Sequence, residues 1–234
     1  MRFRLTHVGV SLPALALAAA LLGGCGSSSS SNELASKTPV QIIDAAKAAA
    51  ASAVSAHVAG SIVSDGKPIS LDMELVAGKG GKGRITVEGL SVKLIQVDKA
   101  VYINGSTAFY KRLAGTAAAQ LLQGKWLKAP ANSANFESFS QLTNLRKLVG
   151  STLAAHGKLT RGESTTVAGQ KVVGLTDGTK DGTLYVATTG APYPIALVKK
   201  GASGGRIVFD RWNKPVTIVP PADSVNINQL QSGR

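Results

Sequence analysis

Ser203 is the residue whose surroundings most resemble a catalytic motif. Residues 201–205 match the Gly-x-Ser-x-Gly pattern in which serine hydrolases carry their nucleophile. That pattern needs a strand before the serine, a helix after it and a histidine farther along the chain. The segment after Gly205 has the character of a strand, and no histidine follows Ser203. We therefore interpret the segment as a hairpin turn and keep hydrolysis through Ser203 as an alternative to be tested.

Two other glycine-rich segments resemble ion-binding loops. Residues 78–83 imitate a phosphate loop, but they lack the Gly-Lys-Ser/Thr ending and the helix that must follow it. Residues 177–182 place Asp177 and Asp181 four positions apart, whereas calcium needs more oxygen ligands at closer spacing. We interpret both segments as turns between strands and expect no metal site.

The remaining candidates offer little for catalysis. Beyond the N-terminal stretch there are two histidines, His57 and His156, and neither has a cysteine or a second histidine close in sequence. We interpret both as structural, and Trp126 and Trp212 as core or rim aromatics rather than ligand platforms. A single cysteine excludes an intramolecular disulfide and a thiolate metal cluster. We therefore expect no enzyme, no catalytic residue and no cofactor.

The one cysteine, Cys25, lies where a lipid anchor would be attached. Two early arginines precede an apolar run over residues 8–22, which is too short to span a bilayer comfortably and is typical of a secretory signal. Its Leu-Gly-Gly-Cys ending resembles the bacterial lipobox, in which the cysteine becomes the first residue and its thiol receives a diacylglyceryl group. With palmitate or similar chains, each buried CH₂ adds about 0.8 kcal/mol of membrane binding. The alternative is a leftover cysteine after an ordinary signal peptide.

This motif divides the chain into three parts. Residues 1–24 would be a lipoprotein signal peptide, residues 25–37 the lipidated cysteine with a flexible Ser-rich tether, and residues 38–234 a single domain. The domain has 197 residues, which is enough for one core and short for two. The 12 residues after Cys25 would reach about 20 Å on average and about 40 Å at most. We expect a lipid-anchored protein on the extracytoplasmic side of the cell membrane.

Composition and charge exclude several classes of protein. Hydrophobic residues make up 44% and charged residues 17%, so the chain is not intrinsically disordered. Beyond the N-terminal stretch no run approaches the roughly 20 apolar residues of a membrane span. Without Arg2 and Arg4 the chain has 24 basic and 13 acidic residues, a net charge of +11. These basic residues are scattered with few aromatics among them, which argues against nucleic acid and leaves anionic lipid headgroups or simple solubility.

Short segments in which apolar and polar residues alternate predict two groups of strands separated by a helical middle. The first group has five members at roughly ten-residue spacing: residues 58–62, 69–75, 85–87, 92–94 and 101–103. The second group has six members: residues 165–167, 171–175, 183–187, 195–199, 206–209 and 215–219. Turns rich in Gly, Asp and Lys join them, which favours antiparallel neighbours.

Three helices are expected. Thr38, Pro39 and Gln41 form a capping box with proline at the first helical position, which predicts a helix to about residue 55 with Val40, Ile43 and residues 46–50 on its packed side. Residues 106–123 and 139–156 have helical composition or spacing.

The order helix, strands, helices, strands indicates an α+β domain built on one large antiparallel sheet.

Several segments in this order resemble the actinobacterial lipoprotein family that includes mycobacterial LppX and LprG. The strongest is Phe-Asp-Arg-Trp-Asn-Lys-Pro-Val-Thr-Ile at residues 209–218, followed by two prolines, with support from residues 124–126, 167–173 and 183–190. The resemblance implies a strongly curved sheet, a half-barrel of LolA-like type, with helices packed across its concave face. It also implies an apolar cavity between sheet and helices that receives acyl chains of lipids or glycolipids.

The candidate residues for such a cavity come from the apolar positions of the strands and of the second helical segment. A strand of six to eight residues is about 20–26 Å long, comparable to an extended acyl chain. The alternative is that these residues form an ordinary solid core. The candidates are Ile69, Leu71, Met73, Leu75, Ile85, Val87, Val92, Leu94, Leu142, Leu145, Leu148, Leu184, Val186, Ile195 and Leu197.

Two functions from different classes remain. The first is a lipid-binding lipoprotein, expected as a monomer, that shields acyl chains during carriage or transfer across the cell envelope, with an unknown export or transport protein as a partner. The second is a surface interaction lipoprotein with a filled core that recognises a protein or a polysaccharide. The size of the cavity separates them, because a void below about 100 Å³ could not admit an acyl chain.

Overall fold

The computed structural model describes residues 30–64, 66–133, 136–154 and 156–227, so the expected signal peptide and Cys25 lie outside the described residues. Within these residues, twelve strands form one sheet in the order β12-β6-β5-β4-β3-β2-β1-β11-β10-β9-β8-β7. All neighbours are antiparallel except β12, which pairs with β6 in parallel. The expected single large antiparallel sheet is confirmed.

The sheet is made of two meanders that meet where β1 pairs with β11. Its strands are β1 (Ser55–Ser64), β2 (Lys67–Val76), β3 (Gly80–Val87), β4 (Leu90–Val97), β5 (Ala100–Gly105), β6 (Trp126–Pro130), β7 (Leu159–Val167), β8 (Gln170–Asp177), β9 (Gly182–Ala187), β10 (Pro194–Lys199), β11 (Gly205–Asp210) and β12 (Ser224–Asn226). The helices are the single-turn η1 (Leu34–Ser36), α1 (Pro39–Ser52), α2 (Thr107–Leu122), α3 (Glu137–Leu142) and α4 (Leu145–Ala154).

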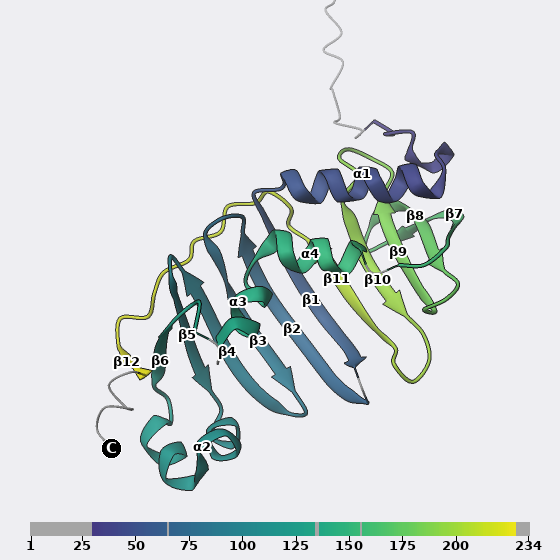
Figure 1. Ribbon diagram of the computed structural model, residues 1–234. Helices are drawn as coiled ribbons and strands as arrows, with labels where there is room; N and C mark the ends of the chain where they lie inside the picture. The colour runs from purple at the N-terminus through teal and green to yellow at the C-terminus, as the bar shows by residue number, and fades with distance from the viewer. Residues whose placement is uncertain (1–29, 65, 134–135, 155, 228–234) are drawn as a thin grey trace, which may run out of the picture.

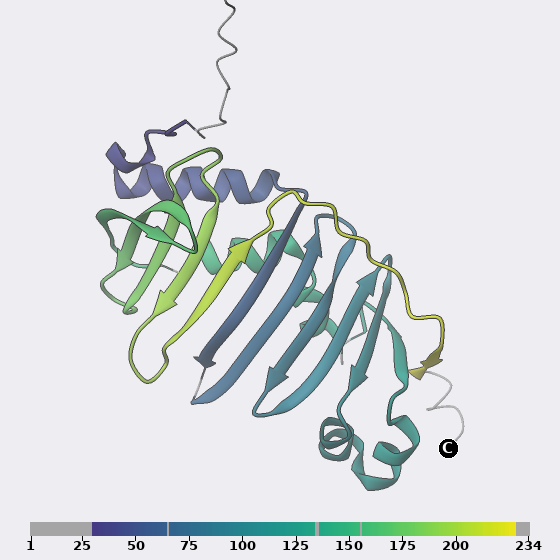
Figure 2. The same ribbon diagram turned by 180° about the vertical axis from the view of Figure 1, so that it is seen from behind.

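The sheet is open and curved, and its helices α1, α3 and α4 lie across the concave face (Figure 1). The other face carries no helix over its strands (Figure 2). Helix α2 lies at one end of β4 and β5 instead. No helix of the described residues is long and apolar enough to cross a membrane. The half-barrel with helices on its concave face agrees with the expected fold class.

Helix α1 begins as the sequence predicts. The Gln41 amide donates to Thr38 Oγ1 at 3.3 Å, and the Thr38 amide donates to Gln41 Oε1 at 3.0 Å, so the capping box is complete. The buried side of α1 carries Ile42, Ile43, Ala46 and Ala50. Val40 is 65% exposed, so its placement on the packed side was wrong. Because the chain enters β1 at Ser55, the helix ends at Ser52 and not near residue 55.

Two other expected elements differ from the structure, and one strand was not expected. The single helix expected over residues 139–156 is two helices, because the chain leaves the helix at Thr143 and Asn144 caps α4 by accepting a hydrogen bond from the Lys147 amide at 3.0 Å. Residues 215–219 form no strand, since Pro215 and the prolines after it cannot donate to a ladder. They run along the ends of the strands toward β12, which the sequence did not predict (Figures 1 and 2).

Residues 31–36, which we expected in the flexible tether, are packed against the domain. Ser31 forms an isolated bridge with Thr189, and the Asn32 side chain donates to the carbonyls of Ala187 and Gly190, both at 3.0 Å. Leu34 is buried in the core, and the Arg161 guanidinium donates to the carbonyl of Ala35. The ordered domain therefore begins several residues before the boundary expected at residue 38.

Candidate functional site

A pocket of about 290 Å³ lies between the helices α1 and α4 and the strands β7 to β10. Its apolar walls come from both helices and four strands, and its charged residues come from the ends of β8 and β10 and from the neighbouring loop. The lining residues are Ile43, Thr152, Leu153, His156, Leu159, Leu175, Asp177, Lys180, Gly182, Leu184, Leu197 and Lys199.

A row of three leucines forms the sheet side of this pocket. Leu184 of β9 pairs with Leu175 of β8 and with Leu197 of β10. Residues that pair directly across adjacent strands point to the same face, so these side chains stand side by side. We name them the leucine row. Ile43 of α1 and Leu153 of α4 line the pocket from the helical side.

Charged residues line the pocket at one end of the leucine row. Gly182 of β9 pairs with Asp177 and with Lys199, two residues farther along the same three strands. This second row faces the same side of the sheet, about 7 Å from the leucines. Lys180 and His156 line the pocket from neighbouring loops. We name His156, Asp177, Lys180 and Lys199 the polar rim.

Asp177 holds the loops of the polar rim together. One of its carboxylate oxygens accepts from the Thr179 hydroxyl at 2.6 Å and from the Thr179 amide at 2.9 Å. The other accepts from the Gly157 amide at 2.8 Å. The Thr179 hydroxyl, then these two amides, and finally the charge of Lys180 lower the pKa of Asp177 to about 2. The turn expected at residues 177–182 is confirmed, and its aspartate ties β8 to the start of β7.

The structure brings two of the fifteen predicted lining residues, Leu184 and Leu197, to this pocket. Seven others are fully buried in the main core: Met73, Leu75, Ile85, Val92, Leu94, Leu145 and Val186. Four are partly buried against that core: Leu71, Val87, Leu142 and Leu148. Ile69 is half-buried, and Ile195 packs in a separate small cluster with Val172 and Ala187.

The predicted lining residues of β2 to β4 have little open space because the α3–α4 junction lies directly on the sheet there. A Cβ placed on Gly81 of β3 would stand 2.5 Å from Leu75 Cδ2 and 3.3 Å from the carbonyl oxygen of Thr143. Thr143 is fully buried, and its hydroxyl donates to the side-chain carbonyl of Gln96 on β4. A glycine in the strand thus lets the helical layer fill this part of the concave face.

A second hollow, of about 340 Å³, lies between α1 and α4 on the outer side of the helices. Its lining includes Ala50 of α1 together with Arg146, Val149 and Leu153 of α4. Leu153 lines both hollows, so this side chain is part of the wall that separates them.

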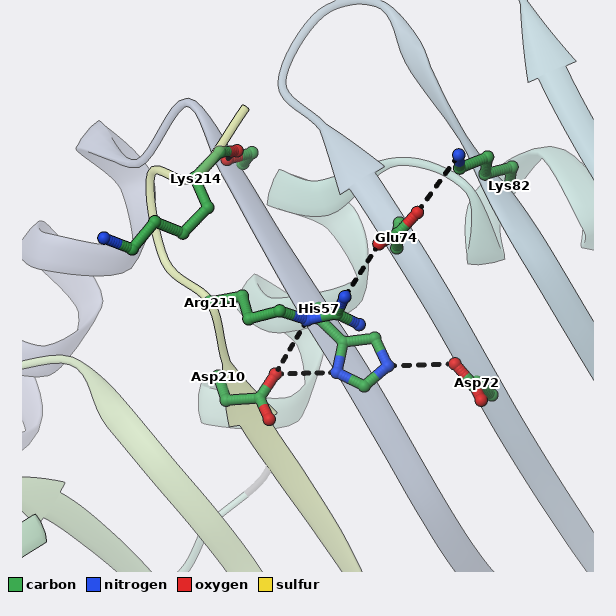
Figure 3. A network of polar contacts seen from close by, with 8 residues as sticks. His57, Asp72, Glu74, Lys82, Asp210, Arg211 and Lys214 are labelled. Carbon is green, nitrogen blue, oxygen red and sulfur yellow. Dashed lines mark hydrogen bonds and ion pairs between the residues drawn. The ribbon is translucent and has the colours of Figure 1, made fainter. Parts of the chain in front are cut away.

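His57 has a structural role on the face without helices. It alternates with the buried Ala56 and Val58, so its ring points away from the core. Figure 3 shows the ring between two carboxylates: Nδ1 lies 2.6 Å from Asp210 Oδ1, and Nε2 lies 2.9 Å from Asp72 Oδ1. These contacts link β11, β1 and β2 across the join between the two meanders.

The other candidates from the sequence also have structural places. Ser203 lies in an exposed turn between β10 and β11, so a strand follows it and the hairpin interpretation is confirmed. Residues 77–79 form a turn, and the glycines at 80, 81 and 83 belong to β3. Trp126 is half-buried in β6, and Trp212 stacks on Tyr193 at 4.6 Å between ring centroids. Among the described residues, no three or more His, Cys, Asp or Glu side chains are grouped to hold a metal ion.

Sequence reasoning missed Ile43, Leu153, Leu159 and Leu175 of the pocket. Leu175 and Leu159 belong to the second meander. The signal that could have indicated them is their position, because each is the apolar strand residue nearest to Asp177 on its own strand. Ile43 was already expected on the packed side of α1, but nothing in the sequence showed that it faces a hollow rather than a neighbour.

The open antiparallel sheet with helices across its concave face is a fold that this chain shares with mycobacterial lipoproteins of the LppX type. LprF from Mycobacterium bovis has this fold, with a TM-score of 0.57 and 16% identity over 79% of this chain and 97% of that one. Lipoprotein LppX of Mycobacterium tuberculosis has it too, with a TM-score of 0.50 and 18% identity over 77% of this chain and 98% of that one. No sequence family and no curated protein matches the sequence. The resemblance to these lipoproteins, stated from the sequence, is thus confirmed at the level of fold.

Proposed function

We propose that this protein is a membrane-anchored extracytoplasmic lipoprotein that holds an acyl chain of a lipid or glycolipid for carriage or transfer across the cell envelope. The observation that carries the proposal is the pocket of about 290 Å³ between α1, α4 and the leucine row. This pocket has a mainly apolar lining between the helices and the sheet, and its volume is above the limit of about 100 Å³ for admitting a chain. The shared fold with the lipoprotein LppX supports the same conclusion.

The volume of the pocket limits how much chain it accepts. An apolar cavity of about 150 Å³ takes up one benzene molecule, which corresponds to about 25 Å³ per carbon. On that scale the pocket accepts about twelve carbons, either a whole short chain or one end of a longer one. At about 0.8 kcal/mol per buried CH₂, this burial would contribute about 10 kcal/mol before the cost of ordering the ligand.

Anchoring through Cys25 completes the proposal. Because the carbonyl of Ser30 accepts a hydrogen bond from the Gly190 amide at 3.3 Å, only residues 26–29 would separate the lipidated cysteine from the first contact with the domain. The five residue steps from Cys25 to Ser30 span about 18 Å at most, so the domain would stay close to the membrane. Replacing Cys25 with Ser should move the protein from the membrane fraction to the medium and remove the diacylglyceryl mass from its N-terminal peptide. Absence of the diacylglyceryl mass from the N-terminal peptide of the wild type would refute the anchor.

The cargo is tested by native mass spectrometry of the full chain purified from its host. The wild type should carry a lipid mass, and Leu197→Trp should reduce its occupancy at least fivefold, because the indole intrudes on the leucine row. The matched control is Val198→Trp, at the next position of the same strand and on the opposite face. Melting curves establish that both variants fold. Persistent absence of any lipid from the wild type would refute the proposal.

A further inference from the structure

Polar and apolar residues are separated along the pocket. The leucine row and the Asp177–Gly182–Lys199 row lie on the same face of β8, β9 and β10, two residues apart along each strand. The opposite end of the leucine row leads to Val173 and Val186, which are fully buried beneath the helices. A ligand chain on the leucines therefore has its polar end beside the lysines, about 7 Å away, and its apolar end toward the core.

Positive charge predominates around the polar rim. The three loops that meet there, residues 156–158, 177–182 and 199–200, contain four lysines (158, 180, 199 and 200) and two aspartates (177 and 181), a net charge of +2. Lys180 and Lys199 line the pocket itself. An anionic group at this point would therefore be attracted to two ammonium groups.

The one carboxylate of the rim lowers the positive charge there but does not reverse it, because Asp177 shares the rim with both Lys180 and Lys199. Both oxygens of Asp177 already accept hydrogen bonds, from Gly157 and Thr179, and its side chain is 6% exposed. Three hydrogen bonds thus take up most of the acceptor capacity of this carboxylate, whereas the ammonium groups of the rim are donors only. The polar atoms offered to a ligand match the chemistry of a carboxylate or a phosphate.

We infer that the ligand of this pocket is a single-chain amphiphile with an anionic group, bound at the rim by Lys180 and Lys199 while its chain lies on the leucine row. The inference rests on the proposed function and narrows it, because the volume of about 290 Å³ admits one chain of about twelve carbons rather than several. A free fatty acid and a lipid phosphate share the required chemistry. They differ in the number of oxygens and in charge, so the experiment includes both.

Photo-crosslinking tests this inference on the full chain as its host makes it, incorporated into phosphatidylcholine vesicles. Three probes carry a diazirine at the end of a twelve-carbon chain: dodecanoic acid, dodecyl phosphate and dodecyl glucoside. Mass spectrometry of the labelled peptides measures how much of each probe is attached to β8, β9 and β10. We expect one or both anionic probes to label the leucine row about five- to tenfold more than the glucoside does, and the stronger of the two identifies the source. The double variant Lys180→Gln/Lys199→Gln should remove this preference.

The control variant Lys158→Gln/Lys200→Gln removes the same net charge from lysines that do not line the pocket, and it should keep the preference. Equal labelling of the leucine row by all three probes would overturn the anionic ligand but leave the lipid-binding function standing. If both double variants lost the preference for anionic probes equally, the inference would also be overturned, because the net charge of the protein would then explain the preference. Failure of every probe to label these strands would count against the proposed function itself.

Discussion

The two ends of the sheet show how similar strands can form either a solid core or a hollow. In the filled half, β2 to β5, the α3–α4 junction lies on the sheet at Gly81, and Thr143 is fastened to Gln96. In the hollow half, β7 to β10, the pocket of about 290 Å³ lies between the leucine row and the end of α4. Alternation of apolar residues sets which face of a strand is buried. What lies over that face depends on whether another element can approach it closely.

Truncating a leucine in each half should give the largest difference. Leu94 of β4 is fully buried, so Leu94→Ala leaves a new cavity and should lower the free energy of unfolding by about 3–4 kcal/mol. Leu197 already borders open space, so Leu197→Ala should lower it by only about 1 kcal/mol. Urea unfolding of both variants measures this. Equal losses would mean that the hollow half is packed in solution.

A pair of glycine substitutions should sharpen the same contrast. Gly81→Ala places a methyl group 2.5 Å from Leu75 Cδ2 and 3.0 Å from the carbonyl oxygen of Glu74, which should cost about 1–3 kcal/mol. Gly150 lies in α4 with no atom within 4 Å of an added Cβ. Gly150→Ala should therefore stabilise the protein by about 0.5–1 kcal/mol through helix propensity. Thermal unfolding compares the two, and a stabilising Gly81→Ala would contradict the close packing around Gly81.

Sequence patterns predicted the elements better than their contacts. The capping box at Thr38 and the alternation over residues 69–75 are local signals, and both gave the right element. Leu184 and Leu197 were correctly placed on strands. Leu175 lies beside Leu184 in the leucine row only because of the register that the turn after Asp177 sets. The break at Asn144 carried a capping signal within a continuous helical pattern, and tertiary contact with β3 and β4 decides its use.

No residue type in the sequence indicated which half of the sheet would be filled and which would be hollow. Val92 and Leu184 are both apolar strand residues, yet one lies in the filled half and the other lines the pocket. The difference arises from how far the helices descend onto each end of the sheet, which involves contacts between segments far apart in the chain. The polar rim was likewise missed, because its residues come from three separate loops.

Acid should destabilise the hollow half selectively, and this effect should be smaller than those of the leucine and glycine substitutions. The pKa of Asp177 is about 2 in the folded protein, below its ordinary value of 3.8. A lowered pKa means that folding favours the carboxylate, so the contribution of Asp177 to stability is complete above about pH 4 and is lost as the pH falls toward 2.

Protonation of Asp177 weakens its hydrogen bonds to Gly157 and Thr179, while the neutral contact between Thr143 and Gln96 in the filled half does not titrate. Protection from hydrogen exchange, taken relative to the intrinsic rate at each pH, should therefore fall first in residues 157–182 between pH 4 and pH 2, and Asp177→Asn should show reduced protection there at both pH values. The neighbouring Asp181→Asn variant serves as the matched control and should behave as the wild type does. An equal loss of protection in both halves of the wild type would show that the rim does not depend on this carboxylate.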